Sequence, residues 1–298
     1  MLGDLRRYLP GALYEPLERR PTERHLQQVC EHLTYLLRTS KTYLPRPVVL
    51  HPQPAGEPAG GMYHGAFLFG DVSGFTPLSE ELKALGQAGA ERITETINSL
   101  FSELVSVLFD HGGTLLKFGG DALLGLFPAE GERGSSDRLR ASDPLEAGMA
   151  ASALRATQAA LAMQMVMQQE KYAAIEVPGG ETRALQIKCG ISSGPYFAAH
   201  IGTGPDPDKE TGHQGTMAYV TTGHTVNLAE QAESHANPGE VVMTEATRAL
   251  LDDQVTVGPV SKDPDDDFLL VHDAATAETN TLGHPLLGEP PEGPLDAQ

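Results

Sequence analysis

The chain has 298 residues, with 40 Asp and Glu against 21 Lys and Arg, so its formal net charge is −19. Contacts to nucleic-acid phosphates need clustered basic side chains, and this balance argues against a nucleic-acid partner. The start, MLGDLRRYLP, lacks the apolar centre of a signal peptide, and no apolar run approaches the length of a membrane span. With two cysteines, Cys30 and Cys189, at no metal-ligand spacing, we expect a cytoplasmic protein without a membrane contact.

Residues 1–50 are predicted to be a separate N-terminal helical segment. Its apolar residues recur at helical spacing between Pro21 and Pro45, which indicates one amphipathic helix. This helix can pack on its own domain or contribute to a dimer contact, and the sequence favours neither. Residues 51–62, HPQPAGEPAGGM, have the composition of a linker. The apolar positions of the helix are Leu26, Val29, Leu33, Leu36 and Leu37.

The first segment that carries chemistry is GAFLFGDVSGFT, at residues 65–76. Gly65–Phe69 is predicted to be a buried strand, so Asp71 lies just beyond its end, where the chain turns into a helix. A helix start presents backbone N–H groups without acceptors, which makes it a ready cradle for phosphate. This cradle is expected at Ser73, Gly74, Phe75 and Thr76.

The second such segment is HGGTLLKFGGDALLGLF, at residues 111–127. Thr114–Phe118 and Ala122–Phe127 are predicted to be strands of a hairpin, because Gly119-Gly120 between them is a strong turn signal. An aspartate alone is commonly a cap or a turn residue. A carboxylate at a strand end and one at a hairpin tip meet, however, if the strands are neighbours, and two hard oxygen ligands suit a magnesium ion that carries phosphates. We therefore expect Asp71 and Asp121 to be metal ligands.

The remaining elements predict a ferredoxin-like α+β sandwich, an antiparallel sheet with helices on one face. Helices are expected from about Ala90 to Phe109, from about Glu146 to Lys171 and from Thr225 to Ala236. Further strands are expected at Leu185–Ile191 and Val241–Thr244. This domain is predicted to span residues 63–273. Residues 274–298 have the composition of an acidic, Pro- and Gly-rich tail or linker.

Three segments occur in an order that resembles the catalytic domain of the class III adenylate and guanylate cyclases. They are F-x-D-V-x-G-F-T, H-G-G-x-x-x-K-x-x-G-D-A-L and G-H-T-V-N-L-A at residues 223–229, and the resemblance covers roughly residues 62–250. The stretch L-K-F-x-G-D-A-L-L is similar to the first cyclase domain of the soluble, bicarbonate-responsive adenylyl cyclase type. The resemblance implies the class III nucleotidyl cyclase architecture.

The resemblance also implies a function, a cofactor and a partner. Two Mg²⁺ or Mn²⁺ ions would be held by Asp71, Asp121 and the backbone carbonyl of Val72, and ATP would be converted to 3′,5′-cyclic AMP and pyrophosphate. Sites of this family lie between two cyclase domains. The chain is therefore expected to form a homodimer, or a heterodimer with a second cyclase domain.

The residues that complete such a site depart from the family pattern. Lys117 matches the lysine that donates to adenine N1, but its partner position holds Val220, beside Thr221. Asn227 matches the asparagine that orients the ribose, whereas Gln231 stands in place of the arginine that stabilises charge on the phosphorus. A neutral amide replaces a guanidinium fork there, so a site completed by Gln231 should be slow.

Two alternatives therefore stay open. One is a catalytically impaired, cyclase-like regulatory domain that binds nucleotide and works with a second cyclase domain. The other is a different phosphotransferase, since D-V-S-G-F-T loosely resembles the phosphate loop of actin-like kinases. The sequence favours ATP over GTP only through Lys117, because an ammonium donor suits the N1 acceptor of adenine.

Overall fold

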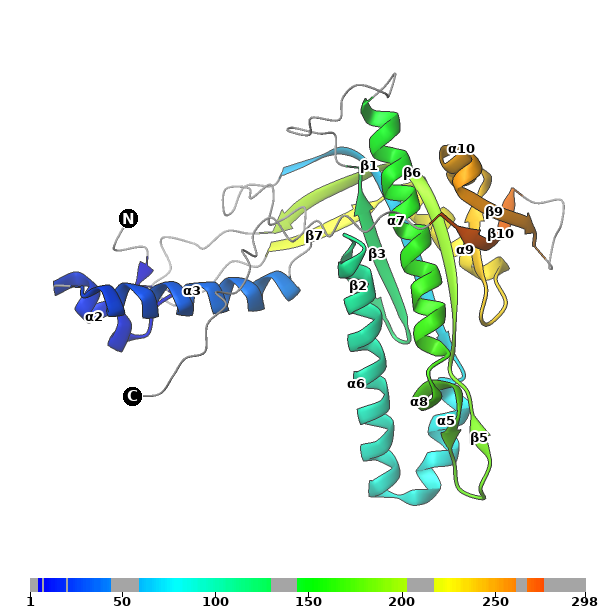
Figure 1. The fold of residues 1–298 in the computed structure, drawn as a ribbon, viewed down its shortest axis with the longest axis horizontal. Coiled ribbons are helices and arrows are strands. Elements are labelled where there is room, and N and C mark those ends of the chain that lie inside the picture. The colour runs from blue at the N-terminus through cyan, green and yellow to red at the C-terminus, as the bar shows by residue number, and fades with distance from the viewer. Residues whose placement is uncertain are drawn as a thin grey trace.

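The computed structural model describes residues 5–6, 8–19, 21–43, 59–129, 144–202, 217–260 and 267–275. The expected linker at residues 51–58 and the expected tail at residues 276–298 lie outside these ranges. Within them, one large sheet is covered by helices, which confirms the predicted α+β class (Figure 1).

The sheet is mixed rather than purely antiparallel. Its strand order is β2-β3-β1-β6-β8-β10-β9, with β7 also paired to β6. Among these pairings only β6 with β8 is parallel. The strands of the described residues are β1 (Ala59–Ser73), β2 (Thr114–Gly119), β3 (Ala122–Pro128), β6 (Gln186–Gly202), β7 (Met217–Thr222), β8 (Val241–Thr244), β9 (Val255–Pro259) and β10 (Phe268–Ala274), with a separate pair of β4 (Ile175–Glu176) and β5 (Thr182–Arg183).

Helices α5 (Phe75–Leu82), α6 (Gln87–Asp110) and α7 (Pro144–Met167) cover one face of the sheet. Helix α7 buries a stripe of alanine and methionine side chains, and the small alanines let the helix lie close to the strands. The short helices α8 (Glu170–Ala173) and α10 (Glu245–Leu251) add Tyr172 and Leu251 to the same core.

Helix α9 (His224–His235) packs on the opposite face, which the prediction of helices on a single face did not include. Its Ala229 belongs to a second apolar cluster with Phe67, Leu124 and Tyr196. The strands β1 and β3 are therefore buried on both sides, and this explains their continuous apolar runs. Asp71 lies on the same face of β1 as Phe67, because side chains alternate between the two faces of a strand and residues two or four positions apart point the same way.

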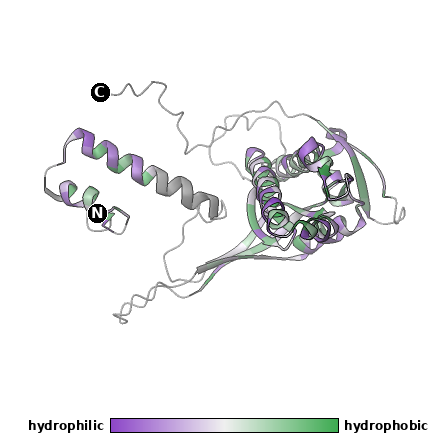
Figure 2. Cartoon of the chain, turned by 90° about the horizontal axis from the view of Figure 1, so that it is seen from below, coloured by the Kyte–Doolittle hydropathy of each residue, from purple (hydrophilic) through white to green (hydrophobic). Residues whose placement is uncertain are grey.

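Three strands extend beyond the helices as an arm: the start of β1, the end of β6, and β7 (Figures 1 and 2). Strand β1 pairs with β6 from Ala59 opposite His200 to Ser73 opposite Gln186. Residues 59–62, expected to be linker, are thus strand, because their pairing partner lies far away in the sequence and outweighs the local glycine composition. Strand β7 was not predicted.

The predicted N-terminal helix is confirmed as α3 (Glu23–Tyr43), preceded by α2 (Gly11–Arg19). The two pack against each other around Leu9, Tyr14 and Val29, so they form a small apolar core of their own. Figure 2 shows hydrophobic and hydrophilic residues alternating along the coloured part of α3, as in an amphipathic helix. No helix in the described ranges combines the length and apolar character that crossing a membrane requires.

Candidate functional site

Asp71 and Asp121 are brought together at one end of the sheet. Asp71 lies near the end of β1, directly opposite Ala122 of β3. The Val72 N–H donates a hydrogen bond of 3.1 Å to the Asp121 carbonyl oxygen, which ties the tip of the hairpin to the end of β1. Convergence of the strand end with the hairpin tip follows from the pairing of β1 with β3.

The hairpin turn differs by one residue from the prediction. Gly119 pairs with Ala122, so the two-residue loop is Gly120-Asp121 rather than Gly119-Gly120. Gly120 has a φ of 72°, a left-handed conformation that glycine adopts without strain. Asp121 is therefore itself a loop residue, and its carboxylate stands at the tip rather than at the start of β3.

The phosphate cradle predicted at residues 73–76 lies at the start of α5. Gly74 caps this helix with a φ of 95°, and as a glycine it provides no side-chain acceptor for the N–H groups of the first turn. A Cβ on Gly74 would lie 2.7 Å from the Ala184 carbonyl oxygen, so both the conformation and the close approach require glycine. The N–H groups of this turn have no acceptor within the helix.

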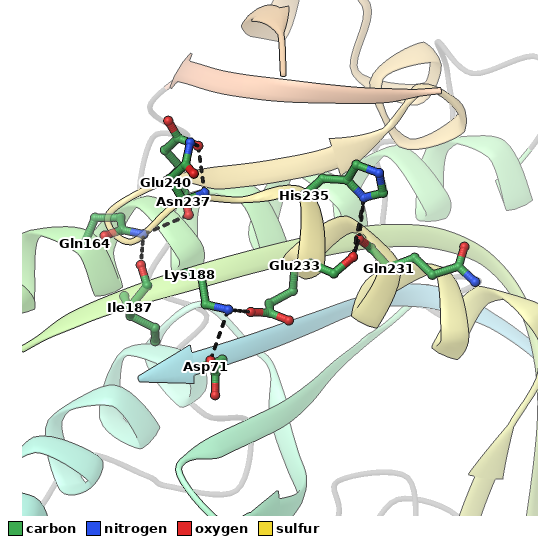
Figure 3. Close-up of polar contacts among 10 residues, drawn as sticks. Asp71, Gln164, Ile187, Lys188, Gln231, Glu233, His235, Asn237 and Glu240 are labelled. Atoms are coloured by element: carbon green, nitrogen blue, oxygen red, sulfur yellow. Dashed lines mark hydrogen bonds and ion pairs between the residues drawn. The ribbon is translucent and has the colours of Figure 1, made fainter. Parts of the chain in front are cut away.

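A lysine that the sequence analysis did not select completes this end of the sheet. Lys188 of β6 is the direct register partner of Asp71, and its Nζ lies 3.2 Å from Asp71 Oδ2. The same ammonium forms an ion pair with Glu233 of α9, so it lies between the two carboxylates (Figure 3). A lysine inside the apolar run LQIKCGI was the available signal, because a charge in such a strand needs a partner.

Burial and charge act in opposite directions on this lysine. Burial alone would lower the pKa of Lys188, but its contacts with Glu233 and Asp71 outweigh that effect and raise the pKa above its ordinary value. Lys188 is therefore a cation at neutral pH. Its contact with Asp71 shows that a positive charge is accommodated at this carboxylate.

The donor set at this end fits a hard divalent cation. Two carboxylates and a backbone carbonyl are oxygen ligands of the kind that Mg²⁺ prefers. No group of three or more His, Cys, Asp or Glu side chains suited to a metal occurs among the described residues. Any ion at Asp71 and Asp121 would therefore need further oxygen ligands, which nucleotide phosphates and water supply.

The base-recognition positions are not brought together by strand pairing. Lys117 of β2 pairs with Leu124, close to the carboxylate end of the sheet. Val220 and Thr221 lie on β7, opposite Ala199 and Ala198 in the arm. Neighbouring residues on a strand point to opposite faces, so only one of Val220 and Thr221 can face a given ligand.

Asn227 and Gln231 line a shallow pocket on α9 together with Glu230 and Ser234. This pocket lies apart from the carboxylates: Figure 3 shows the Gln231 side chain pointing away from Lys188 and Asp71. All four lining residues are neutral or acidic, so the pocket offers no cation to a phosphate. The chain thus carries two separate candidate half-sites, one with the carboxylates of Asp71 and Asp121 and one with the amides of Asn227 and Gln231.

Known proteins resemble this chain in sequence and in fold. The profile of the family described as adenylate and guanylate cyclase catalytic domain matches residues 63–263. Adenylate cyclase type 10 of Oryctolagus cuniculus is 34% identical over 90 residues, which are 30% of this chain and 6% of that protein. The human protein of the same name is 39% identical over 70 residues, 23% of this chain and 4% of that protein. The chain thus matches only a small part of these relatives' length.

Two solved structures have a similar fold. The adenylyl cyclase CyaB from P. aeruginosa has a TM-score of 0.51 at 25% identity, covering 72% of this chain and 97% of that chain. A bacterial light-regulated adenylyl cyclase has a TM-score of 0.53 at 16% identity, covering 89% of this chain and 69% of that chain. Since the family profile covers more than half of its residues, the chain belongs to the family of adenylate and guanylate cyclase catalytic domains.

Proposed function

We propose that this nucleotidyl cyclase domain uses ATP and forms 3′,5′-cyclic AMP and pyrophosphate in a site completed by a second cyclase domain. The observation that carries the proposal is the junction of Asp71 and Asp121 through the hydrogen bond from Val72 N–H to the Asp121 carbonyl. This hydrogen bond keeps Asp71 and Asp121 beside the start of α5, where the first backbone N–H groups have no acceptor within the helix. Carboxylates next to such N–H groups suit a triphosphate that carries metal ions.

The residues of the chain have distinct tasks in this reaction. Asp71, Asp121 and the Val72 carbonyl would hold two Mg²⁺ or Mn²⁺ ions, and the start of α5 would receive phosphate oxygens. The bound ions would supply Lewis-acid polarisation of the ribose hydroxyl and of the triphosphate. The ribose 3′-oxygen forms a bond to the α-phosphorus and gives its proton to water, while the bond from the α-phosphorus to the oxygen that bridges to the β-phosphorus breaks and pyrophosphate leaves. The chain's part is to orient these groups in line.

The α9 pocket supports a composite site. It contains Asn227 for the ribose, but Gln231 brings only an amide and Glu230 adds negative charge. Charge that develops on the phosphoryl oxygens needs a cation, and removing such a donor slows phosphoryl transfer by orders of magnitude. A second domain that carries the arginine would complete the carboxylate half-site of this chain.

The arm offers a surface for that second domain. Met62, Phe197, Ile201 and Val220 are 64%, 41%, 54% and 40% exposed. Met62 pairs with Phe197, Val220 pairs with Ala199, and residues 197, 199 and 201 share one face of β6. This exposed apolar face is of the kind that marks a protein interface.

We expect Phe197→Glu to weaken association of the domain with itself or with a second cyclase domain by about tenfold or more, because a charge would enter the centre of the apolar face. Sedimentation velocity measures the dissociation constant. Met165→Glu is the matched control, since Met165 is 70% exposed on α7, away from the arm. Equal weakening by both variants, or by neither, would remove the arm from the interface.

We assign the discrimination between adenine and guanine to Lys117. Lys117→Glu replaces a donor by an acceptor, so it should weaken ATP binding relative to GTP binding, because adenine presents an acceptor at N1 and guanine a donor. Competition titrations with both nucleotides in Mn²⁺ measure the ratio for wild type and variant. An unchanged ratio would make Lys117 a surface residue without a part in base recognition.

Detection of the cyclic nucleotide product tests the proposed cyclase activity directly. Mass spectrometry of reactions with Mg-ATP and with Mg-GTP, at protein concentrations that span dimer formation, should detect cyclic AMP at a rate that rises with concentration. The second candidate, a regulatory domain, is favoured by Gln231 and Glu230 in the α9 pocket. It predicts bound nucleotide without any cyclic product.

A further inference from the structure

Lys188 lies between the carboxylate half-site and helix α9. We propose that it is a resident counter-ion: it holds Asp71 in place before a metal arrives, competes with the incoming metal for that carboxylate, and is retained by Glu233 once displaced. The inference rests on the proposed function in one respect, the assignment of Asp71 as a metal ligand. It concerns a positioning residue, not a group that takes part in bond making.

The contact between Lys188 and Asp71 is built into the sheet. The two residues face each other in the register of β1 and β6, and Nζ lies 3.2 Å from Oδ2 (Figure 3). Their side chains are only 22% and 28% exposed. Solvent therefore screens this pair less than it would screen a fully exposed ion pair.

Competition follows from the position of the ammonium. A divalent ion bound to Asp71 would share its carboxylate with a second cation a few ångströms away, and like charges at that range repel strongly. The ammonium must therefore withdraw from Asp71 before the metal can take its place. The free energy of the ion pair is subtracted from the free energy of metal binding.

Glu233 remains an ion-pair partner for the Lys188 ammonium after the ammonium has left Asp71. Its side chain is only 9% exposed and already forms an ion pair with Lys188, so the buried carboxylate keeps a partner when Asp71 is taken. Helix α9 packs directly on Gly190 of β6, where a Cβ would lie 2.1 Å from the Ala229 carbonyl oxygen, so Glu233 is held close to the strand that carries Lys188. Replacement of the ammonium by a metal ion at Asp71 thus needs a shift of the Lys188 side chain alone.

Titration of the purified chain with Mn²⁺ alone tests the inference, with affinity read by calorimetry and by the electron paramagnetic resonance signal of free Mn²⁺. Lys188→Met should tighten Mn²⁺ binding about tenfold, the equivalent of removing one partly buried ion pair. Glu233→Gln should weaken it, because Lys188 is then left with Asp71 as its sole anionic partner. Lys188→Arg should stay close to wild type.

Two controls separate competition from other effects. Lys188→Met leaves Glu233 buried without its cation, so the double variant Lys188→Met/Glu233→Gln, which buries no lone charge, should also bind Mn²⁺ more tightly while melting as a folded protein. Lys117→Met removes a positive charge from the same end of the sheet without breaking the Asp71 ion pair. It should change the affinity clearly less than Lys188→Met does.

Unchanged or weaker Mn²⁺ binding by Lys188→Met and by the double variant would overturn the inference, as would equal tightening by Lys117→Met. If Asp71→Ala binds Mn²⁺ as wild type does, the metal assignment itself fails. If Asp71→Ala loses binding and Lys188→Met does not tighten it, the assignment stands and only the counter-ion role is wrong.

Discussion

Gln231→Arg is expected to raise cyclic AMP formation by about 10³-fold in a homodimer, the lower end of what an arginine contributes to phosphoryl transfer. Each α9 pocket would then present a guanidinium to the carboxylate half-site of the partner, where wild type presents an amide. A planar fork of donors matches the phosphoryl oxygens and adds the charge that Gln231 lacks. Gln231→Lys is the matched control and should gain less.

A complementation experiment shows whether the two half-sites come from different chains. A chain with both Gln231→Arg and Asp71→Ala supplies the arginine but lacks a metal carboxylate, and wild type supplies the carboxylates alone. Each should be nearly inactive by itself, whereas the mixture should be active. If Gln231→Arg gains nothing while a separate cyclase domain with an intact N-x-x-x-R activates wild type, the natural assembly is a heterodimer. Bound nucleotide without product under every condition would favour the regulatory domain.

Gly190→Ala is expected to lower the free energy of unfolding by about 3 kcal/mol, near the upper end for overpacking. The added Cβ would lie 2.1 Å from the Ala229 carbonyl oxygen and 2.2 Å from the Glu233 backbone nitrogen. Both contacts are with the backbone of α9, so the helix must shift rather than a flexible side chain. The shift would also separate Glu233 from Lys188.

Urea unfolding followed by circular dichroism measures this loss. Gly119→Ala is the control, because nothing lies within 4 Å of a Cβ at that position and its φ is not positive. We expect the control to unfold within about 1 kcal/mol of wild type, since an open position tolerates a methyl group. Equal stability of the two variants would show that α9 does not need the close approach at Gly190.

Local patterns were sufficient for much of the fold and for the meeting of Asp71 and Asp121 at one end of the sheet. The apolar runs of β1 and β3, the stripe along α7 and the turn glycines are all local signals, and they placed Asp71 and Asp121 at meeting points of strands. The hairpin loop was displaced by one residue, because two neighbouring glycines leave open which of them takes the left-handed conformation. The structure resolves this in favour of Gly120.

Non-local pairing could not be predicted in the same way. Strand β7 and the start of β1 depend on β6 as a partner, and the start of β1 has the glycine-rich composition of a linker. The same holds for Lys188, whose position beside Asp71 is a consequence of register across two strands that are distant in sequence. Strands β9 and β10 and helix α10 were also missed, because each is short and weakly periodic.

The most direct test of the metal-bearing half-site is calorimetric titration with Mn-ATP of wild type, Asp71→Ala and Asp121→Ala, with Asp110→Ala as a control acidic residue at the end of α6. We predict that each half-site variant binds Mn-ATP at least about tenfold more weakly, because a hard divalent ion loses a carboxylate ligand. The control should bind as wild type does. Equal affinity of all four proteins would contradict the assignment of Asp71 and Asp121 as the metal ligands of this cyclase domain.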